Sequence, residues 1–278
     1  MDALLGFALV AVIPLALGLD RLTARLPGAA FVAGSLATTG LALRRDAAIA
    51  VALGTPWLVM ALLAAFLAIR RWWRAQRAWA DLGPLVAYAY LAFGAAWLAF
   101  ELAGARPLGV APPFVELTAV HFSYAGFTAA MLATVAARRV AASRPAQSAV
   151  MVSLVLVGPP VVAVGFQFAP ALQVAGAVLL TLGLTALSWL TVRVVVPAAG
   201  DRLAATMLCA SSAAVVVPML LAVWWATGVA AALPAPSVPV MARSHGLANA
   251  IGFAFLGVLG WRRLQREEPR RVLPRCPG

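Results

Sequence analysis

Residues 47–69 read AAIAVALGTPWLVMALLAAFLAI, and the basic aromatic segment RRWWR follows directly at residues 70–74. The apolar stretch contains no charged side chain, and as an α-helix it extends about 34 Å. This length is enough to cross the ~30 Å hydrocarbon core of a bilayer, and Trp and Arg are typical of the interface beyond it. The stretch therefore predicts a membrane-spanning helix that ends at a polar surface.

The rest of the chain has the same character. Of its 278 residues, 64% are hydrophobic and 11% are charged, against about 45–50% and about 25% in ordinary soluble proteins. The alternating pattern of an outer-membrane barrel is absent. We expect an all-α polytopic transmembrane bundle of about nine spans, or eight if the short second block does not cross. The apolar blocks are 3–19, 28–43, 47–69, 82–104, 114–136, 147–168, 171–192, 203–227 and 239–260.

The domain organisation is simple. We expect one transmembrane bundle over residues 1–262 and a short basic cytoplasmic tail over 263–278, without regular structure. Only Met1 and Asp2 precede the first block, so it is interpreted as a retained helix rather than a signal peptide. The segment Gly158-Pro159-Pro160 is expected to kink or break the sixth span.

The basic residues predict an orientation. The net charge is +12 and every basic side chain is an arginine. With the amino terminus outside, 17 arginines fall on the cytoplasmic side, and only Arg44, Arg45 and Arg106 fall outside. This bias follows the positive-inside rule. We therefore expect a multi-pass protein of the cell membrane with a cytoplasmic carboxyl terminus, and no nucleic-acid partner.

Ionisable side chains within three of the spans point to a site. Such groups are costly in a membrane and usually face the protein interior or a water-filled cavity. His121 and His245 lie roughly 12 Å and 9 Å below the outer ends of their helices, so polar groups converge in the outer half of the bilayer. The predicted catalytic residues are His121, His245, Glu116, Glu101 and Asn249.

Neighbouring side chains suggest the walls of a pocket. Tyr124 and Thr128 lie near the helical face of His121, Trp97 and Tyr90 line up with Glu101, and Arg243 is expected to neutralise a carboxylate. Gln167 lies at a similar depth on the sixth span. The predicted substrate-binding residues are Tyr124, Trp97, Tyr90, Thr128, Arg243 and Gln167.

Two short segments resemble a known family. Residues 120–127 read VHFSYAGF and residues 244–253 read SHGLANAIGF. They resemble the paired HFxxAGF and HGxxNxxGF segments of YndJ-like membrane proteins, and the position of the second motif in the last helix is also similar. The resemblance implies a helical membrane protein over most of the chain, and it brings little knowledge of function.

The residues themselves favour an intramembrane enzyme. Histidine, a carboxylic acid in an apolar site and Asn249 form a set suited to acid–base chemistry on a lipophilic small molecule, such as cyclisation, isomerisation or epoxide opening of an isoprenoid- or polyketide-like compound. No phosphate loop, DDxxD cluster or GxSxG elbow occurs, so no cofactor is expected.

Three alternatives stay open at this stage. A proton-coupled transporter also uses buried His and Glu, but no polar path leads to the cytoplasmic side. A structural or assembly protein would use the histidines for interhelical hydrogen bonds. A metal site is disfavoured because no HExxH or ExxH spacing occurs, and we expect no metal. The oligomeric state is not predicted.

Overall fold

The computed structural model describes residues 1–76 and 81–272, and this part of the chain is helical and contains no strand. Residues 273–278 of the predicted tail lie outside it. The first apolar block forms a composite helix of α1 (Asp2–Phe7), η1 (Ala8–Val12) and α2 (Ile13–Leu17). The second and third blocks form α3 (Pro27–Ala42) and α4 (Ala47–Arg74). The fourth and fifth blocks form α5 (Leu82–Leu102), α6 (Phe114–His121), η4 (Phe122–Thr128) and α7 (Ala129–Val140), with η3 (Pro107–Gly109) between α5 and α6.

The second half begins with a helical hairpin. It comprises α8 (Pro145–Phe168) and α9 (Pro170–Leu190), which continues through η5 (Thr191–Val195) and η6 (Val196–Ala198). The last two blocks form α10 (Arg202–Ala214), α11 (Val216–Ala230), α12 (Val238–Met241), η7 (Ala242–Gly246), η8 (Ala248–Phe255) and α13 (Leu256–Val272).

Six helical runs are long and apolar enough to cross a membrane. They span Ala47–Arg74, Leu82–Leu102, Phe114–Val140, Pro145–Phe168, Pro170–Ala198 and Arg202–Ala230, and Asp2–Leu17 is a shorter apolar helix. Large apolar side chains such as Val59, Val157 and Leu220 are more than 45% exposed on different helices. A soluble monomer rarely exposes so many apolar groups, whereas a bilayer accommodates them.

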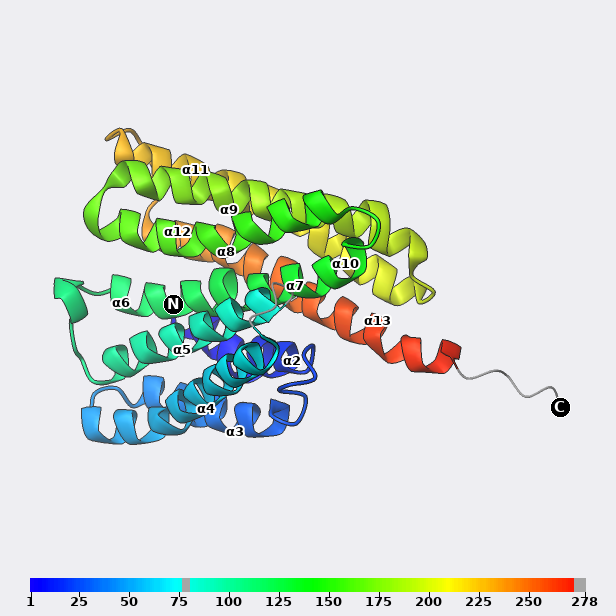
Figure 1. The fold of residues 1–278 in the computed structure, drawn as a ribbon. Coiled ribbons are helices and arrows are strands. Elements are labelled where there is room, and N and C mark those ends of the chain that lie inside the picture. Colours follow the sequence, from blue (N-terminus) through cyan, green and yellow to red (C-terminus); the bar gives the residue numbers. More distant parts are fainter. Residues whose placement is uncertain (77–80, 273–278) are drawn as a thin grey trace.

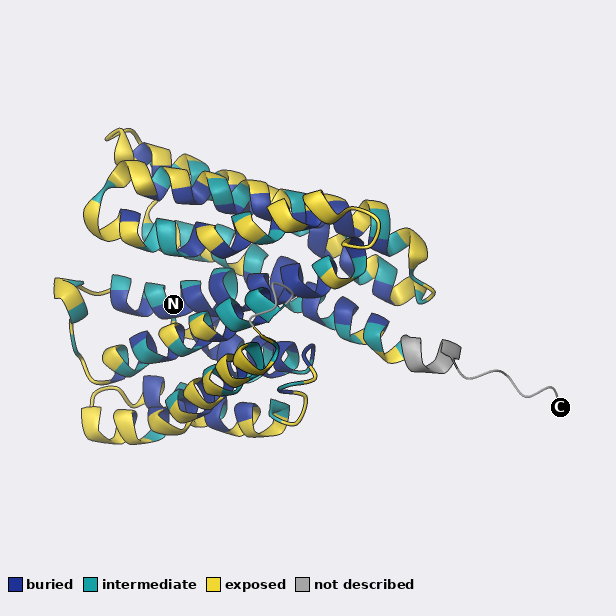
Figure 2. Cartoon of the chain, in the orientation of Figure 1, coloured by how far each residue is buried: buried dark blue, intermediate teal, exposed yellow. Residues whose placement is uncertain are grey.

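The helix formed by α6, η4 and α7 is central. In its apolar stretch 83% of the residues are buried inside the protein, against 33–44% in the apolar stretches of the other five membrane-type helices. Figures 1 and 2 show this mostly buried helix between the bundle of α3, α4 and α5 and the layer of α8, α9 and α11. Residues on the central helix therefore contact both halves of the molecule.

Prolines shape two helices differently. The sixth block was predicted to kink or break, and the finding excludes a break, because α8 runs without interruption through Pro159 and Pro160. Pro160 lacks the N–H that would bond the carbonyl of Leu156, and the hydroxyl of Tyr90 donates to that carbonyl instead. In the eighth block, α10 and α11 are separated at Val215, just before Pro218.

The prediction that residues after 262 lack regular structure is wrong up to Val272, where α13 ends. Nη1 of Arg262 donates to the carbonyl of Leu15 at 2.9 Å, and Nε2 of Gln265 donates to that of Leu19 at 3.2 Å. These bonds hold the helix against α2 and the residues that directly follow it, and its Arg, Gln, Leu and Glu residues are good helix formers. Figure 1 shows the end of α13 extending beyond the bundle.

Candidate functional site

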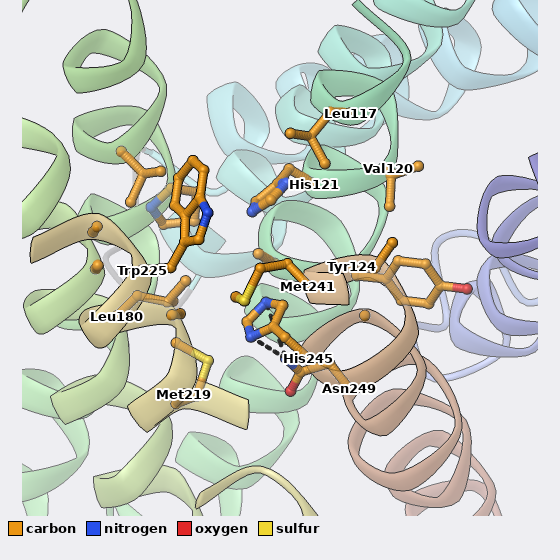
Figure 3. A pocket seen from close by; sticks show the side chains of 18 of the residues that line it. Leu117, Val120, His121, Tyr124, Leu180, Met219, Trp225, Met241, His245 and Asn249 are labelled. Atoms are coloured by element: carbon orange, nitrogen blue, oxygen red, sulfur yellow. Dashed lines mark hydrogen bonds between the residues drawn. The ribbon is translucent and has the colours of Figure 1, made fainter. Parts of the chain in front are cut away.

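A cavity of about 140 Å³ lies between the central helix, the α8–α9 hairpin, α11 and the last helical run. Its walls are mainly apolar, as Figure 3 shows. The labelled apolar residues around it are Leu117, Val120, Leu180, Met219, Trp225 and Met241. A cavity of this kind suits a lipophilic guest, since an apolar void of similar size, ~150 Å³, binds small hydrocarbons.

Three of the predicted catalytic residues meet at this cavity. His121 reaches it from the end of α6, His245 from η7 and Asn249 from η8. Figure 3 shows the two imidazole rings directed toward the same space from opposite sides. The central helix and the last helical run therefore meet at this cavity.

Hydrogen bonds define the state of His245. Its Nδ1 lies 2.6 Å from the carbonyl oxygen of Pro218. A carbonyl only accepts, so Nδ1 carries the proton and donates, and Nε2 of the neutral ring holds a lone pair. Nδ2 of Asn249 is 3.3 Å from Nε2 and 3.4 Å from Nδ1, so this amide lies against the ring and holds it in place.

Both sequence motifs adopt π-helical turns. The first motif enters η4 directly after His121, and the second forms η7 and η8 around His245 and Asn249. Such turns are rare and often occur at functional sites. The motif glycines permit close packing beside them: a Cβ on Gly126 would lie 3.0 Å from Cβ of Tyr90, and one on Gly252 would lie 2.6 Å from Cβ of Ala214.

A second cavity, of about 370 Å³, adjoins the first. His121, Leu117, Pro159, Val162 and Phe166 belong to the walls of both. The predicted residues Trp97 and Gln167 line this second cavity, and Nε2 of Gln167 donates to the carbonyl of Leu108 at 3.2 Å. His121 thus stands where the two spaces meet.

The two predicted carboxylates lie elsewhere. Glu101 and Glu116 line neither cavity. They belong to a charged cluster with Asp2 and Arg44, in which Nη1 of Arg44 is 2.7 Å from Oδ1 of Asp2. The hydrogen bond that Arg44 donates to Asp2 raises the pKa of the guanidinium above its ordinary value. The carboxylates therefore interact with the amino-terminal helix and the α3–α4 connection.

The other predicted residues are distributed as follows. Tyr124 lines the first cavity, and its hydroxyl donates to the carbonyl of Leu4 at 2.8 Å. The hydroxyl of Tyr90 donates to the carbonyl of Leu156, and Oγ1 of buried Thr128 donates to the carbonyl of Ser123 at 2.8 Å. Arg243 is exposed and lines neither cavity. The expected pairing of Arg243 with Glu101 or Glu116 is not seen, since Arg44 occupies that place.

The sequence prediction did not include Gln173 and Trp225. Gln173 is 4% exposed, comes from α9 and lines the first cavity. Trp225 lines it from α11, with Nε1 donating to the carbonyl of Pro236 at 2.9 Å. An amide side chain within an apolar span was the available signal for Gln173.

The site holds imidazoles and amides rather than a set of metal ligands. Among the described residues, no group of three or more His, Cys, Asp or Glu side chains is arranged to hold a metal ion. The two histidines and Asn249 can instead accept, donate and orient protons on a guest in the cavity.

These features define a class: an all-helical bundle with membrane-type helices and an apolar cavity that contains two histidines. A family model for YndJ-like proteins matches residues 3–253, nearly the whole chain, and the chain belongs to this family. The match includes both motifs and, except for Met1, all residues that line the two cavities. No curated protein and no solved structure gives a significant match.

Proposed function

We propose that this protein is an intramembrane enzyme that performs acid–base chemistry on a lipophilic small molecule. The observation that carries the proposal is the presence of His121 and His245 on opposite sides of one apolar cavity. Nε2 of His245 is the base, since Nδ1 donates to the carbonyl of Pro218. His121 exchanges a proton from the other side, and Asn249 orients the ring and the guest.

Isomerisation, cyclisation and epoxide opening all fit this arrangement, because each requires one proton to be removed and one to be supplied. None of them needs a redox group or a phosphate-binding loop. The carboxylates of Glu101 and Glu116 have no direct part in this scheme, since they lie in the cluster with Asp2 and Arg44.

Purified protein in lipid nanodiscs would be incubated with a lipid extract of its host and followed by mass spectrometry. We expect one lipophilic compound to be consumed and a product of the same mass, or heavier by one water, to accumulate. His245→Ala and His121→Ala should remain folded and lose this conversion by at least ~100-fold, the range typical of a general acid or base.

The matched control is Ser244→Ala. Ser244 is exposed beside His245, and its hydroxyl bonds only to the carbonyl of Val240. It should convert at the wild-type rate. Undiminished conversion by both histidine variants would overturn the proposal, and so would uptake of a compound into liposomes without chemical change, which would indicate a transporter.

We also propose that the helical runs cross the cell membrane nine times, with the amino terminus outside. The support is the 17-to-3 distribution of arginines between the two sets of connections. In a variant without Cys209 and Cys276, Ser237→Cys should react in whole cells with an impermeant maleimide and Ser143→Cys should not. The reverse labelling would overturn the orientation.

A further inference from the structure

A further pocket, of about 450 Å³, lies between α2, the start of α10 and α13. Three apolar and five charged side chains line it, and none of them lines either cavity near the histidines. We call it the basic pocket, after Arg262, Arg263 and Arg266 in its wall. Figure 1 shows α13 extending beyond the bundle on this side. The basic pocket is therefore a site separate from the one described above.

The basic pocket lies at the level where apolar chain gives way to charged chain. Leu15 and Leu259 in its wall are close to the ends of the first and last apolar blocks, and Met207 is close to the start of the eighth. The arginines follow directly after the last block. In a membrane this level is the interface between the hydrocarbon tails and the headgroups. A pocket with an apolar and a charged wall at this level suits an amphiphile.

Two of the three arginines carry charges that no carboxylate neutralises. Asp201 is already bonded, because its Oδ1 accepts from the amide of Leu203 at 2.8 Å and its Oδ2 pairs with Nε of Arg263. Nη1 of Arg262 donates to a neutral acceptor, the carbonyl of Leu15. In the described part of the chain, the side chain of Arg266 has no hydrogen bond and no ion pair.

These two charges act on each other. Arg262 and Arg266 are four residues apart on α13, so their side chains share one face of the helix, where like charges repel. Burial and the nearby charge of Arg266 lower the pKa of the Arg262 guanidinium below its ordinary value. An anion that bound both guanidinium groups would relieve this repulsion and form charge-assisted hydrogen bonds.

The net charge of the basic pocket favours a singly charged anion. Three arginines and the carboxylates of Asp201 and Glu267 leave one positive charge. A phosphodiester carries one negative charge, and its oxygens match the planar donor geometry of guanidinium groups. A dianionic phosphomonoester would bring excess negative charge beside Glu267, and a zwitterionic headgroup would bring no net charge.

We propose that the basic pocket binds an anionic phospholipid of the phosphatidylglycerol class, with its phosphodiester at Arg262 and Arg266 and its acyl chains along Leu15, Met207 and Leu259. The apolar wall favours a lipid over a soluble phosphodiester, since only the lipid buries apolar surface there. This lipid bridges α13 to α2 and α10. The inference does not depend on the enzyme proposed above.

Native mass spectrometry of the full chain in detergent tests this site. The protein would be titrated with phosphatidylglycerol and with phosphatidylcholine of the same acyl chains. An arginine near an anionic headgroup contributes about fivefold to affinity, so two of them predict that wild-type protein binds the first phosphatidylglycerol at least about tenfold more tightly. Equal affinities for the two lipids would overturn the inference.

Arg266→Gln is the sharpest variant, because Arg266 is exposed and its loss breaks no bond of the described fold. It should reduce the preference for phosphatidylglycerol about fivefold. Arg74→Gln is the matched control, since Arg74 is an exposed arginine at the end of α4 and lies outside the basic pocket. It should change the preference by less than about twofold. An equal reduction by both variants would overturn the inference, because it would indicate attraction to the basic surface in general.

Glycerophosphoglycerol, the same headgroup without acyl chains, separates a lipid site from a site for a soluble anion. At a concentration equal to that of the lipid, it should not displace bound phosphatidylglycerol from the wild type. Displacement would assign the basic pocket to a soluble phosphodiester and overturn the proposed lipid.

Discussion

Two groups of polar side chains inside the protein differ in how far their members bond to one another. Away from the cavities, Nη1 of Arg71 lies 2.9 Å and 3.0 Å from the oxygens of Asp20, and Oγ1 of Thr23 lies 2.6 Å from the hydroxyl of Tyr88. Nε of Arg71 also lies 3.2 Å from Oδ1 of Asp81. Nε therefore pairs with Asp81 by charge without a hydrogen bond, and Nη2 has no hydrogen-bond partner, whereas both oxygens of Asp20 and the hydroxyls of Thr23 and Tyr88 are bonded within the network.

Around the first cavity the polar groups do not bond to one another to the same extent. His121 and His245 face the cavity, and Gln173 and Asn249 each retain an unpaired atom. A closed network holds helices together, since any separation breaks its bonds. An open set gives little stability and keeps its bonding capacity for a guest. The comparison suggests that the two regions respond oppositely to mutation.

The largest expected effect is loss of the closed network. Asp20→Ala leaves the guanidinium of Arg71 without its main partner, and Asp20 is only 2% exposed. Removing one member of a buried ion pair typically costs about 3–5 kcal/mol. We expect the free energy of unfolding, measured by steric trapping in bicelles, to fall by about 3 kcal/mol or more.

Asp46→Ala is the control for Asp20→Ala. Asp46 is exposed and only caps α4, accepting from the amides of Ala48 and Ile49. Loss of such a cap costs about 1 kcal/mol. If the two substitutions lowered the free energy of unfolding equally, the buried network would stabilise the protein no more than an exposed helix cap does.

The helices and part of the site could be predicted from the sequence. Apolar blocks of bilayer length are a one-dimensional signal, so each predicted block coincides with a helical run. Depth was predicted from the helical rise, and the two histidines that it placed at similar depth, His121 and His245, line one cavity. The rotation and neighbours of a helix do not follow from depth, so the proximity of Glu116 to Asp2 was not predicted.

The sequence also could not reveal contacts between distant helices. Tyr90 was predicted to line the pocket, but its hydroxyl serves the carbonyl of Leu156 that Pro160 leaves free. Gln173 was missed because its burial on α9 depends on how closely α8 packs. That packing is so close that a Cβ on Gly165 would collide with the backbone nitrogen of Gln173.

The next largest loss of stability is expected where the hydroxyl of Tyr90 bonds the carbonyl that Pro160 leaves free. Tyr90→Phe removes the hydroxyl and leaves the Leu156 carbonyl unpaired inside the bundle. A buried carbonyl without a partner costs about 1–3 kcal/mol. We expect a loss of about 1–2 kcal/mol in the same unfolding measurement. The double variant Tyr90→Phe with Pro160→Ala should recover part of it, because an alanine in place of the proline restores the helical N–H. No recovery would mean that Tyr90 acts through packing alone.

A smaller effect is expected at the histidine pair. The bond from His245 to Pro218 is one interhelical hydrogen bond, and such bonds in membranes average about 0.6 kcal/mol. His245→Ala should therefore reduce the free energy of unfolding by less than about 1 kcal/mol, while it abolishes the proposed conversion. A loss as large as that of Asp20→Ala would place His245 among the structural groups and remove the contrast between the two regions.

The smallest effect, and the one with the opposite sign, is expected at Gln173. Its Nε2 is buried without a partner, and methionine has nearly the same shape without that polar atom. Removing an unpaired polar group is neutral or stabilising, and sites kept for ligands often carry such a stability cost. Gln173→Met should therefore leave the free energy of unfolding unchanged or raise it by up to about 1 kcal/mol. A clear loss of stability would mean that Gln173 has partners within the fold, and the open region would then resemble the closed one.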